Sequence, residues 1–416
     1  MPYFSKSSML KRPPLPSYRD SAINRAVAKF FLRGLPALNG AAPGSPSLLV
    51  LACEHQDDIF SSAFSILNDS ITQCAFPGAS VAVTHRGQLV ALKAFGHFTY
   101  EPESTPMTPA TVFDLASVSK VVATTAMAML LYERGLLDLE ASIAAIIPEF
   151  IAASPEAKQE ARRRDVTLHM LLAHSSGLPG YEKLFLKAHT RDELLRAAFT
   201  MPLTADPGSR AEYSDIGFIV LGAALERIAG ESLDRFCQRE VFGPLGMSST
   251  AFNPPPEIRS HIPPTVNDQT FRYRVIQGEV HDENASVLGG VAGHAGVFST
   301  AEDVAKFAHA MLNGGYPILH RETIAVFTRR EGKPEGTSRA LGWDTPSHPS
   351  QSGKYFSDGS FGHLGYTGTS LWIDPERQLS VTLLTNRTWP DCSSQAIKAV
   401  RPKFHDVVIE ALENSG

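Results

Sequence analysis

The sequence predicts an α+β protein in which an antiparallel sheet, flanked by helices, carries an inserted and mostly helical subdomain. Near the beginning, residues 79–85 and 88–94 are apolar, β-branched runs that flank the tight turn Arg86-Gly87, which predicts a hairpin. A second hairpin is predicted near the end, where residues 369–374 and 379–385 flank a short turn. Since helical patterns dominate between the two hairpins, we expect both ends of the chain to build one sheet.

Helices are predicted where apolar residues recur at helical spacing between residues that favour helix ends. Thr190 with Glu193 forms a capping box, and Ser299-Thr300 with Glu302 is placed to form another. The predicted helices span residues 117–134, 190–199, 217–229, 299–312 and 394–412. We expect the last two to cover the sheet.

Residues 57–416 are expected to form a single catalytic domain. Its α/β subdomain comprises about residues 57–125 and 290–416, and its helical subdomain about residues 126–289. Residues 253–285 and 330–361 show no regular pattern, and we expect such long loops to form walls of a substrate pocket.

Residues 1–56 are expected to be a poorly ordered N-terminal extension, because prolines interrupt every periodic pattern there. Within it, Ser47 to Cys53 is faintly similar to the end of a lipoprotein signal peptide, but the apolar stretch is short and lies far from Met1. We therefore expect a cytoplasmic protein, with the cell envelope or secretion as the alternative.

Composition excludes several classes of function. The net charge of −5 over 416 residues, without a long basic run, gives nucleic acid no electrostatic footprint, so we expect a small, roughly neutral ester or amide substrate. Four scattered cysteines form no C-x-x-C pair, which argues against structural zinc. The longest apolar run, Val121 to Leu131, is too short to span a bilayer, so no transmembrane segment is expected.

The chemistry is predicted to begin at Ser117, in the first turn of a predicted helix. Unpaired N–H groups at a helix start can stabilise an alkoxide or an oxyanion. Lys120, three positions on, lies on the same face and can reach the Ser117 hydroxyl. It could act as the base if burial lowers its pKa, or as a cation that lowers the pKa of a neighbouring phenol. Serine and lysine at this spacing are common by chance, so the pair predicts a catalytic site only when other motifs accompany it.

Two later segments supply those motifs. Tyr213 and Asp215 lie at the start of another apolar helix, and His363-Leu-Gly365-Tyr366 is a glycine-rich segment before a strand. His174 is expected to hold a turn, while Trp343 and Trp372 are expected to be core or pocket wall.

With these three motifs the chain resembles the serine β-lactamase and penicillin-binding protein superfamily, in the AmpC-type branch, and most closely the family VIII carboxylesterases. The resemblance covers about residues 79–386 and implies a β-lactamase/transpeptidase-like fold without a cofactor. It implies that Ser117 is acylated, that Lys120 is its proton partner and that Tyr213 is the general base.

The third motif carries the remaining implied roles. His363 takes the place of the family's lysine, and the N–H groups of Ser117 and Tyr366, which follows Gly365, form the oxyanion hole. A second register would instead make Tyr366-Thr-Gly368 the third motif.

Two departures from the family pattern bear on the substrate. Asp215 stands where these β-lactamases have an asparagine, and an ionised carboxylate cannot donate a hydrogen bond to an amide carbonyl. His363 removes a lysine cation that would pair with a substrate carboxylate. We therefore expect a carboxylesterase acting on short-chain esters, with a β-lactamase or D-alanyl-D-alanine carboxypeptidase as the alternative.

Two functions of other classes also fit some of the residues. A catalytically silent ligand sensor could share the fold, although Ser117, Lys120 and Tyr213 speak against it. A metal hydrolase could draw together residues without a recognised ligand spacing, namely His281, Asp282, Glu283, His294 and His363. We expect no metal, and the oligomeric state is left open.

Overall fold

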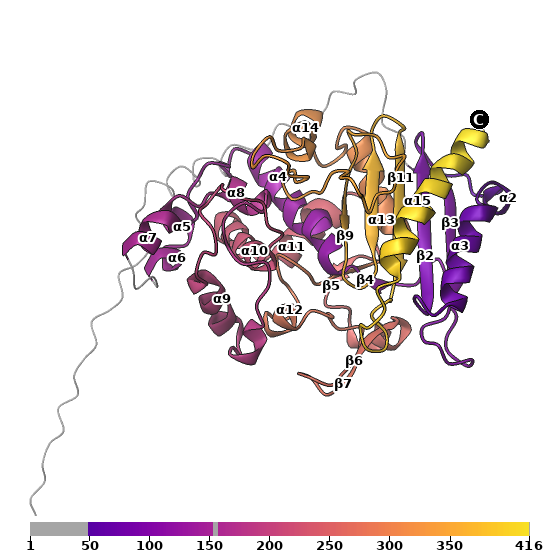
Figure 1. Cartoon of the computed structure of the whole chain (residues 1–416), viewed down its shortest axis with the longest axis horizontal. Helices are drawn as coiled ribbons and strands as arrows, with labels where there is room; N and C mark the ends of the chain where they lie inside the picture. The colour runs from indigo at the N-terminus through magenta and orange to yellow at the C-terminus, as the bar shows by residue number, and fades with distance from the viewer. Residues whose placement is uncertain (1–48, 153–156, 416) are drawn as a thin grey trace, which may run out of the picture. The chain divides into compact units, whose positions relative to one another are not determined.

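The computed structural model describes residues 49–152 and 157–415 (Figure 1). Its main sheet has six strands, in the order β1-β3-β2-β11-β10-β9, and only the β1/β3 pair is parallel. Both predicted hairpins are confirmed, and the antiparallel pairing of β11 with β2 joins them. The strands are β1 (Val50–Leu51), β2 (Gly78–His85), β3 (Gln88–Gly96), β9 (Phe361–Leu364), β10 (Ser370–Asp374) and β11 (Leu379–Thr385).

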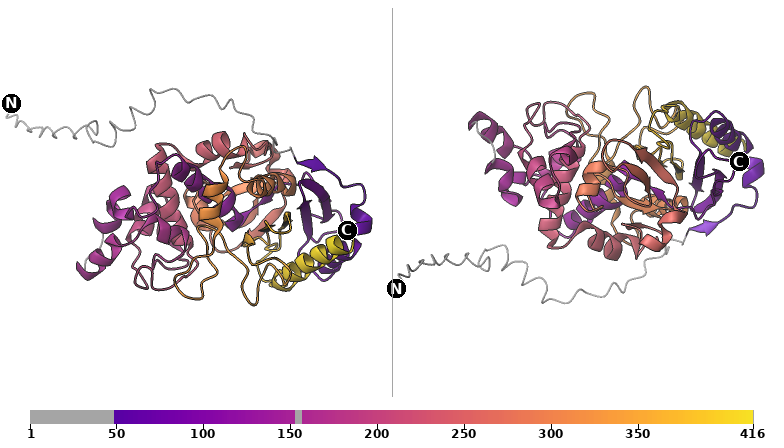
Figure 2. Two further views of the ribbon diagram at one scale, coloured as in Figure 1. Left: turned by 90° about the horizontal axis from the view of Figure 1, so that it is seen from above. Right: turned by 90° about the horizontal axis from the view of Figure 1, so that it is seen from below.

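Helices cover both faces of this sheet, as predicted. On one face α3 (Ser61–Thr72) packs beside α15 (Ile397–Asn414), over a cluster of apolar residues that includes Trp372 and Phe404 (Figure 2). On the other face α13 (Ala301–Leu312) packs against β2, β10 and β11.

One detail of α13 differs from the prediction. Its N-cap is Thr300, whose side chain accepts a hydrogen bond from the Asp303 N–H, so the expected capping role of Glu302 is wrong. With Thr300 as the cap, the third helical position is Asp303. Glu302 instead pairs with Lys306 at 3.2 Å.

The helical segments between the hairpins include α9 (Arg191–Thr200) and α10 (Asp215–Ala229). The capping box of Thr190 with Glu193 is confirmed, and α10 ends at Gly230 with φ +70°. Besides the helix after Ser117, described below, the other helices are α2 (Gln56–Ile59), α5 (Ile143–Ile146), α6 (Glu149–Ala152), α7 (Ala157–Arg164), α8 (Leu168–Leu172), η3 (Leu184–Leu186), α11 (Leu233–Cys237), η4 (Gln238–Phe242), η5 (Pro256–His261), α12 (Glu283–Val287) and α14 (Arg321–Thr328).

The structure also has two small sheets that are separate from the main one. The first joins β4 (Phe113–Asp114), β8 (Val297–Ser299) and β5 (Ala251–Phe252). The second is a hairpin of β6 (Pro264–Asp268) and β7 (Arg274–Gln277), which falls within a segment that showed no regular sequence pattern.

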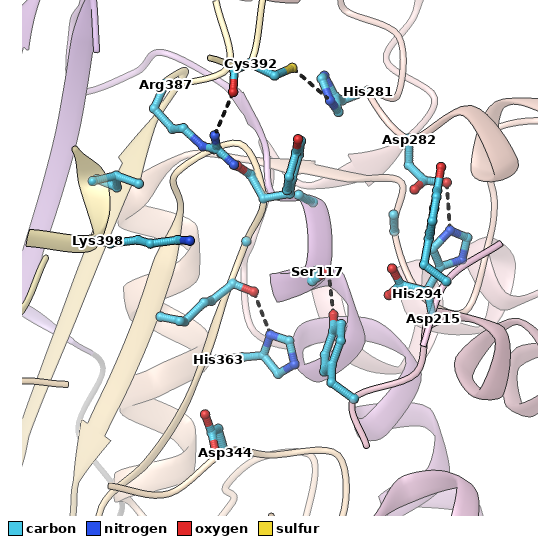
Figure 3. A pocket seen from close by; sticks show the side chains of 18 of the residues that line it. Ser117, Asp215, His281, Asp282, His294, Asp344, His363, Arg387, Cys392 and Lys398 are labelled. Carbon is cyan, nitrogen blue, oxygen red and sulfur yellow. Dashed lines mark hydrogen bonds and ion pairs between the residues drawn. The ribbon is translucent and has the colours of Figure 1, made fainter. Parts of the chain in front are cut away.

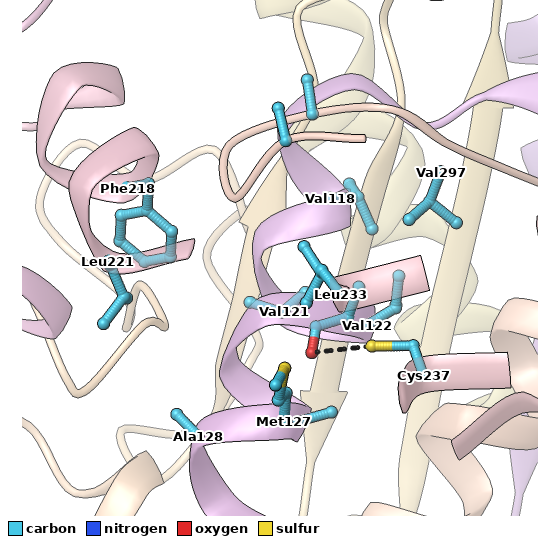
Figure 4. Close-up of a cluster of buried hydrophobic side chains, with 14 of the residues drawn as sticks. Val118, Val121, Val122, Met127, Ala128, Phe218, Leu221, Leu233, Cys237 and Val297 are labelled. Carbon is cyan, nitrogen blue, oxygen red and sulfur yellow. Dashed lines mark hydrogen bonds between the residues drawn. The ribbon is translucent and has the colours of Figure 1, made fainter. Parts of the chain in front are cut away.

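The apolar run after Ser117 forms the buried axis of the molecule. It passes from a 3-10 turn, η1 (Ala116–Val118), through a π-helical turn, η2 (Lys120–Thr125), into α4 (Ala126–Glu133). Val121, Val122 and Met127 are fully buried here against α10, α11 and β8 (Figure 4). A buried rather than membrane-spanning helix was expected from this run. None of the helices in residues 49–152 and 157–415 has the length and apolarity that a bilayer span requires.

Most of the expected N-terminal extension, together with Ser47 of the lipoprotein-like stretch, lies outside the described residues. Val50 and Leu51 nevertheless pair with β3, so the sheet begins before residue 57.

Candidate active site

Ser117 lies where β4 passes into the buried helix. The residue before it, Ala116, has a left-handed φ of +47°, a conformation that non-glycine residues rarely adopt. The backbone N–H of Ala116 donates to the Asp114 carboxylate at 2.8 Å, and the Thr369 hydroxyl donates to the Leu115 carbonyl at 2.8 Å. These bonds hold the turn that presents Ser117 to a cavity.

Two side chains donate hydrogen bonds to the hydroxyl oxygen of Ser117, which lies among the residues that line a cavity (Figure 3). Lys120 Nζ lies 3.0 Å from Ser117 Oγ, and the Tyr213 hydroxyl lies 2.8 Å from it. Tyr213 comes from the segment before α10, and Asp215 is the first residue of that helix. The structure therefore brings together residues that are almost a hundred positions apart in the sequence.

The Lys120 amine is fully buried and has three acceptors. Besides Ser117 Oγ, it donates to Asp215 Oδ1 at 2.7 Å and to the His294 carbonyl at 3.0 Å. Burial alone would lower the Lys120 pKa, but the nearby Asp215 and Tyr213 outweigh burial and raise it. An ammonium has three N–H donors, which matches the three acceptors.

Tyr213 is protonated in this arrangement. Burial and the Asp215 carboxylate raise the Tyr213 pKa to about 12, although Lys120 acts in the opposite direction. The side chain is held by His174, whose ring lies 4.8 Å from the Tyr213 ring and whose Nδ1 accepts the Ser214 N–H at 3.0 Å. His174 thus holds a turn, as expected, while Trp343 and Trp372 are fully buried in the core.

His363 lies at the end of β9 beside Tyr213, with ring centroids 5.9 Å apart. Its Nδ1 lies 2.8 Å from the Leu364 carbonyl, so that nitrogen carries the hydrogen. Burial, with the charges of Lys120 and Arg339, holds the His363 pKa well below its ordinary value. The ring is therefore neutral at pH 7.

The residues after His363 approach the Ser117 turn closely. A Cβ atom added at Gly365 would lie 2.5 Å from the Leu115 carbonyl oxygen, so only glycine allows this contact. Tyr366 follows with its side chain 53% exposed and its ring over the Arg387 guanidinium at 4.4 Å. The predicted residues Asp215, His363, Gly365 and Tyr366 all line the same cavity as Ser117 and Tyr213.

This cavity has a volume of about 700 Å³. Both segments without a regular sequence pattern contribute to its wall, as expected: one supplies His281, Asp282 and Glu283, and the other Arg339 and Asp344. Cations also line it, namely Lys183, Arg339, Arg387, Lys398 and Arg401.

Sequence reasoning missed the roles of three residues of the site. Asp114 holds the Ser117 turn, the His294 carbonyl accepts from Lys120, and Arg339 lies 5.3 Å from the Tyr213 ring. The glycine-rich run from Gly289 to Gly296 was a signal for the second of these, because it marks a segment that comes close to other backbone.

The histidines and acids considered for a metal site have other partners. His294 Nε2 lies 2.7 Å from Asp282 Oδ1, and His281 Nε2 lies 3.9 Å from Cys392 Sγ. Within residues 49–152 and 157–415, no group of three His, Cys, Asp or Glu side chains is placed to hold a metal ion.

Comparisons with known proteins agree with this geometry. The model of the family described as "Beta-lactamase" matches residues 61–400. An N-acetylmuramyl-L-alanine amidase of Bacillus subtilis (strain 168) is 31% identical, over 75% of this chain and 77% of that protein. A putative D-alanyl-D-alanine carboxypeptidase of Salmonella typhimurium (strain LT2) is 32% identical, over 75% of this chain and 79% of that protein.

Solved structures share the fold at low sequence identity. EstCE1, a hydrolase with promiscuous acyltransferase activity, superposes with a TM-score of 0.68 at 23% identity, over 85% of this chain and 99% of that one. A class C β-lactamase from Rhodobacter sphaeroides gives a TM-score of 0.65 at 21% identity, over 85% of this chain and 99% of that one. The protein therefore belongs to the β-lactamase family and is a serine hydrolase of the β-lactamase and penicillin-binding protein type.

Proposed function

We propose that this hydrolase is a carboxylesterase that forms an acyl-enzyme on Ser117. The observation that carries the proposal is the pair of hydrogen bonds that Ser117 Oγ receives from Lys120 and Tyr213, at 3.0 and 2.8 Å. A hydroxyl contacted by a cation and a phenol can lose its proton to that pair as it attacks a carbonyl carbon.

The reactive form has lost one proton from the coupled Lys120 and Tyr213 pair. Since three acceptors favour the Lys120 ammonium, Tyr213 becomes the phenolate and takes the Ser117 proton while Oγ bonds to the ester carbonyl carbon. The N–H groups of Ser117 and Tyr366 receive the oxyanion. The carbon–oxygen bond to the alcohol then breaks, and Tyr213 returns the proton to the leaving alkoxide. Water releases the acyl group by the same steps.

Esters are preferred in this proposal because the site lacks a cation at His363. The neutral ring cannot pair with a substrate carboxylate, and one oxygen of Asp215 is occupied by Lys120. The solved structure of EstCE1, a hydrolase with promiscuous acyltransferase activity, is a precedent for the fold alone.

A second candidate, hydrolysis of peptides ending in D-alanine or of muramyl amides, has its own observation. Arg387, Lys398 and Arg401 line the cavity, and none of them pairs with a carboxylate among the described residues. They could receive the carboxylate of such a substrate. Two relatives at 31–32% identity carry the names amidase and putative D-alanyl-D-alanine carboxypeptidase.

The test compares hydrolysis of a short-chain nitrophenyl ester, a chromogenic cephalosporin and a peptide ending in D-alanyl-D-alanine. Ser117→Ala should abolish ester turnover, whereas Ser248→Ala, at an exposed serine outside the cavity, should not. A burst of nitrophenolate equal to the enzyme concentration would support the acyl-enzyme. Preferred peptide cleavage would make the second candidate correct, and ester turnover by Ser117→Ala would refute the mechanism.

A further inference from the structure

The segment Gly278–Ala285 has no part in the mechanism proposed above, yet it contacts the residues that hold Ser117. The backbone N–H of His281 donates to Asp114 Oδ2 at 2.6 Å. The other oxygen of Asp114 accepts from the N–H of Ala116, the residue with the left-handed φ beside Ser117. The Asp114 carboxylate is buried, and its removal would leave both N–H groups without the acceptor that they have now.

The next residue, Asp282, contacts the other side of the site. Its Oδ1 accepts from the Ala285 N–H, which caps α12, and lies 2.7 Å from His294 Nε2. His294 is almost fully buried, and its carbonyl oxygen is the third acceptor of the Lys120 amine. Asp282 therefore fixes the side chain of the residue whose backbone orients Lys120.

The segment is itself held rigidly. Arg272 donates to the carbonyls of Val280 and His281 at 2.7 and 2.6 Å. Asp268 accepts from Arg272 Nε at 3.2 Å and from backbone N–H groups of the β6–β7 turn. The hairpin that sequence reasoning missed thus anchors Val280 and His281.

We propose that Asp114, Asp282 and His294 are positioning residues, and that residues 281–282 couple the backbone of Ser117 to the amine of Lys120. The inference rests on the proposed role of Ser117 and Lys120. Asp282 acts through His294, so its loss should let the His294 carbonyl move away from Lys120. A displacement of about 1 Å at a reacting group can cost about 100-fold in rate.

The decisive variants are Asp282→Ala, Asp282→Asn and His294→Leu, measured with the nitrophenyl ester. Asp282→Ala and His294→Leu should each lower the burst rate and kcat about 10- to 100-fold, with KM changed less than about threefold. Asp282→Asn keeps an oxygen for both donors, so it should retain activity within about threefold of the native enzyme. Because both residues act on one contact, the double variant Asp282→Ala/His294→Leu should fall no further than either single variant.

Thr190→Ala is the matched control, because it also removes a helix N-cap but in α9. It should lower the melting temperature without changing the burst rate. If Asp282→Ala does not fold by circular dichroism, His294→Leu and Asp282→Asn decide the question.

Three results would overturn the inference while leaving the mechanism intact. They are native burst rates in Asp282→Ala or His294→Leu, a raised KM with unchanged kcat, and additive losses in the double variant. Activity of Ser117→Ala would instead refute the proposed function itself, so the two failures are distinguishable.

Discussion

At the scale of single residues, the site depends on one buried ion pair. Lys120 and Asp215 lie 2.7 Å apart, with side chains 0% and 18% exposed. A buried pair of this kind is costly to break, because the remaining charge has no partner. Asp215 also raises the pKa of both Lys120 and Tyr213, the two groups that contact Ser117 Oγ.

Replacing Asp215 should therefore shift the pH dependence of activity. In Asp215→Asn the charge that raises both pKa values is gone, so the pair loses its proton at lower pH. The alkaline rise of kcat/KM should move to lower pH, and stopped assays across pH 6–11 would measure it. Asp344→Asn, which removes a carboxylate of the same cavity, should leave the rise in place. A shift toward higher pH would contradict the protonation scheme.

The neutral ring of His363 leads us to a separate prediction about substrate preference. His363→Lys places a cation beside Tyr213, where it can form a charge-assisted bond with a substrate carboxylate. We expect kcat/KM for a cephalosporin to rise about tenfold relative to the ester, which corresponds to about 1.4 kcal/mol. His363→Gln is the control, because it is polar but uncharged and should show no such gain. An equal change with both substrates would show that charge at this position does not select the substrate.

At the scale of elements, the buried helix after Ser117 is held by hydrogen bonds to the backbone of residues 293–297. Thr124 donates to the Gly293 carbonyl at 2.7 Å, Lys120 to the His294 carbonyl, and the Val297 N–H to Ser119 Oγ at 3.1 Å. The same segment also lies against α10, where only glycine fits, since a Cβ atom at Gly293 would lie 2.0 Å from the Phe218 carbonyl oxygen.

Gly293→Ala should consequently push residues 293–297 away from α10. Overpacking of this kind costs about 1–3 kcal/mol, and the same shift should lower kcat because it moves the His294 carbonyl. Urea unfolding and ester kinetics would measure the two effects. Gly332→Ala is the control, because a Cβ atom there meets nothing within 4 Å and φ is not left-handed. Unchanged stability in Gly293→Ala would mean that α10 adapts.

At the scale of the whole molecule, features encoded by neighbouring residues could be predicted from the sequence, whereas features that depend on distant partners could not. The two hairpins and the Thr190 capping box were predictable because their signals lie within a few residues. The roles of Asp114 and His294 were not, since each depends on a partner far along the chain: the His281 N–H for Asp114 and the Lys120 amine for the His294 carbonyl. The β6–β7 hairpin was hidden because Pro264 begins one of its strands.

The same contrast applies to the site. Ser117, Lys120 and Tyr213 could be chosen from motifs, and the structure brings Lys120 and Tyr213 within hydrogen-bond distance of Ser117. The contact of Asp215 with Lys120 and the hydrogen on His363 Nδ1 could not be chosen, because each depends on a partner's position in space.

The last prediction concerns the unity of the fold. A single apolar cluster contains Leu194 of α9 in the helical segments and also Leu371 and Leu384 of the main sheet. Since both parts share this core, we expect them to unfold in one cooperative step. Leu194→Ala, which removes a fully buried side chain, should cost about 2–5 kcal/mol. Its unfolding midpoint should fall equally by far-ultraviolet circular dichroism and by tryptophan fluorescence, because Trp372 reports on the sheet. A fluorescence midpoint that stays at the native value would show that the sheet keeps its structure after the helical segments unfold.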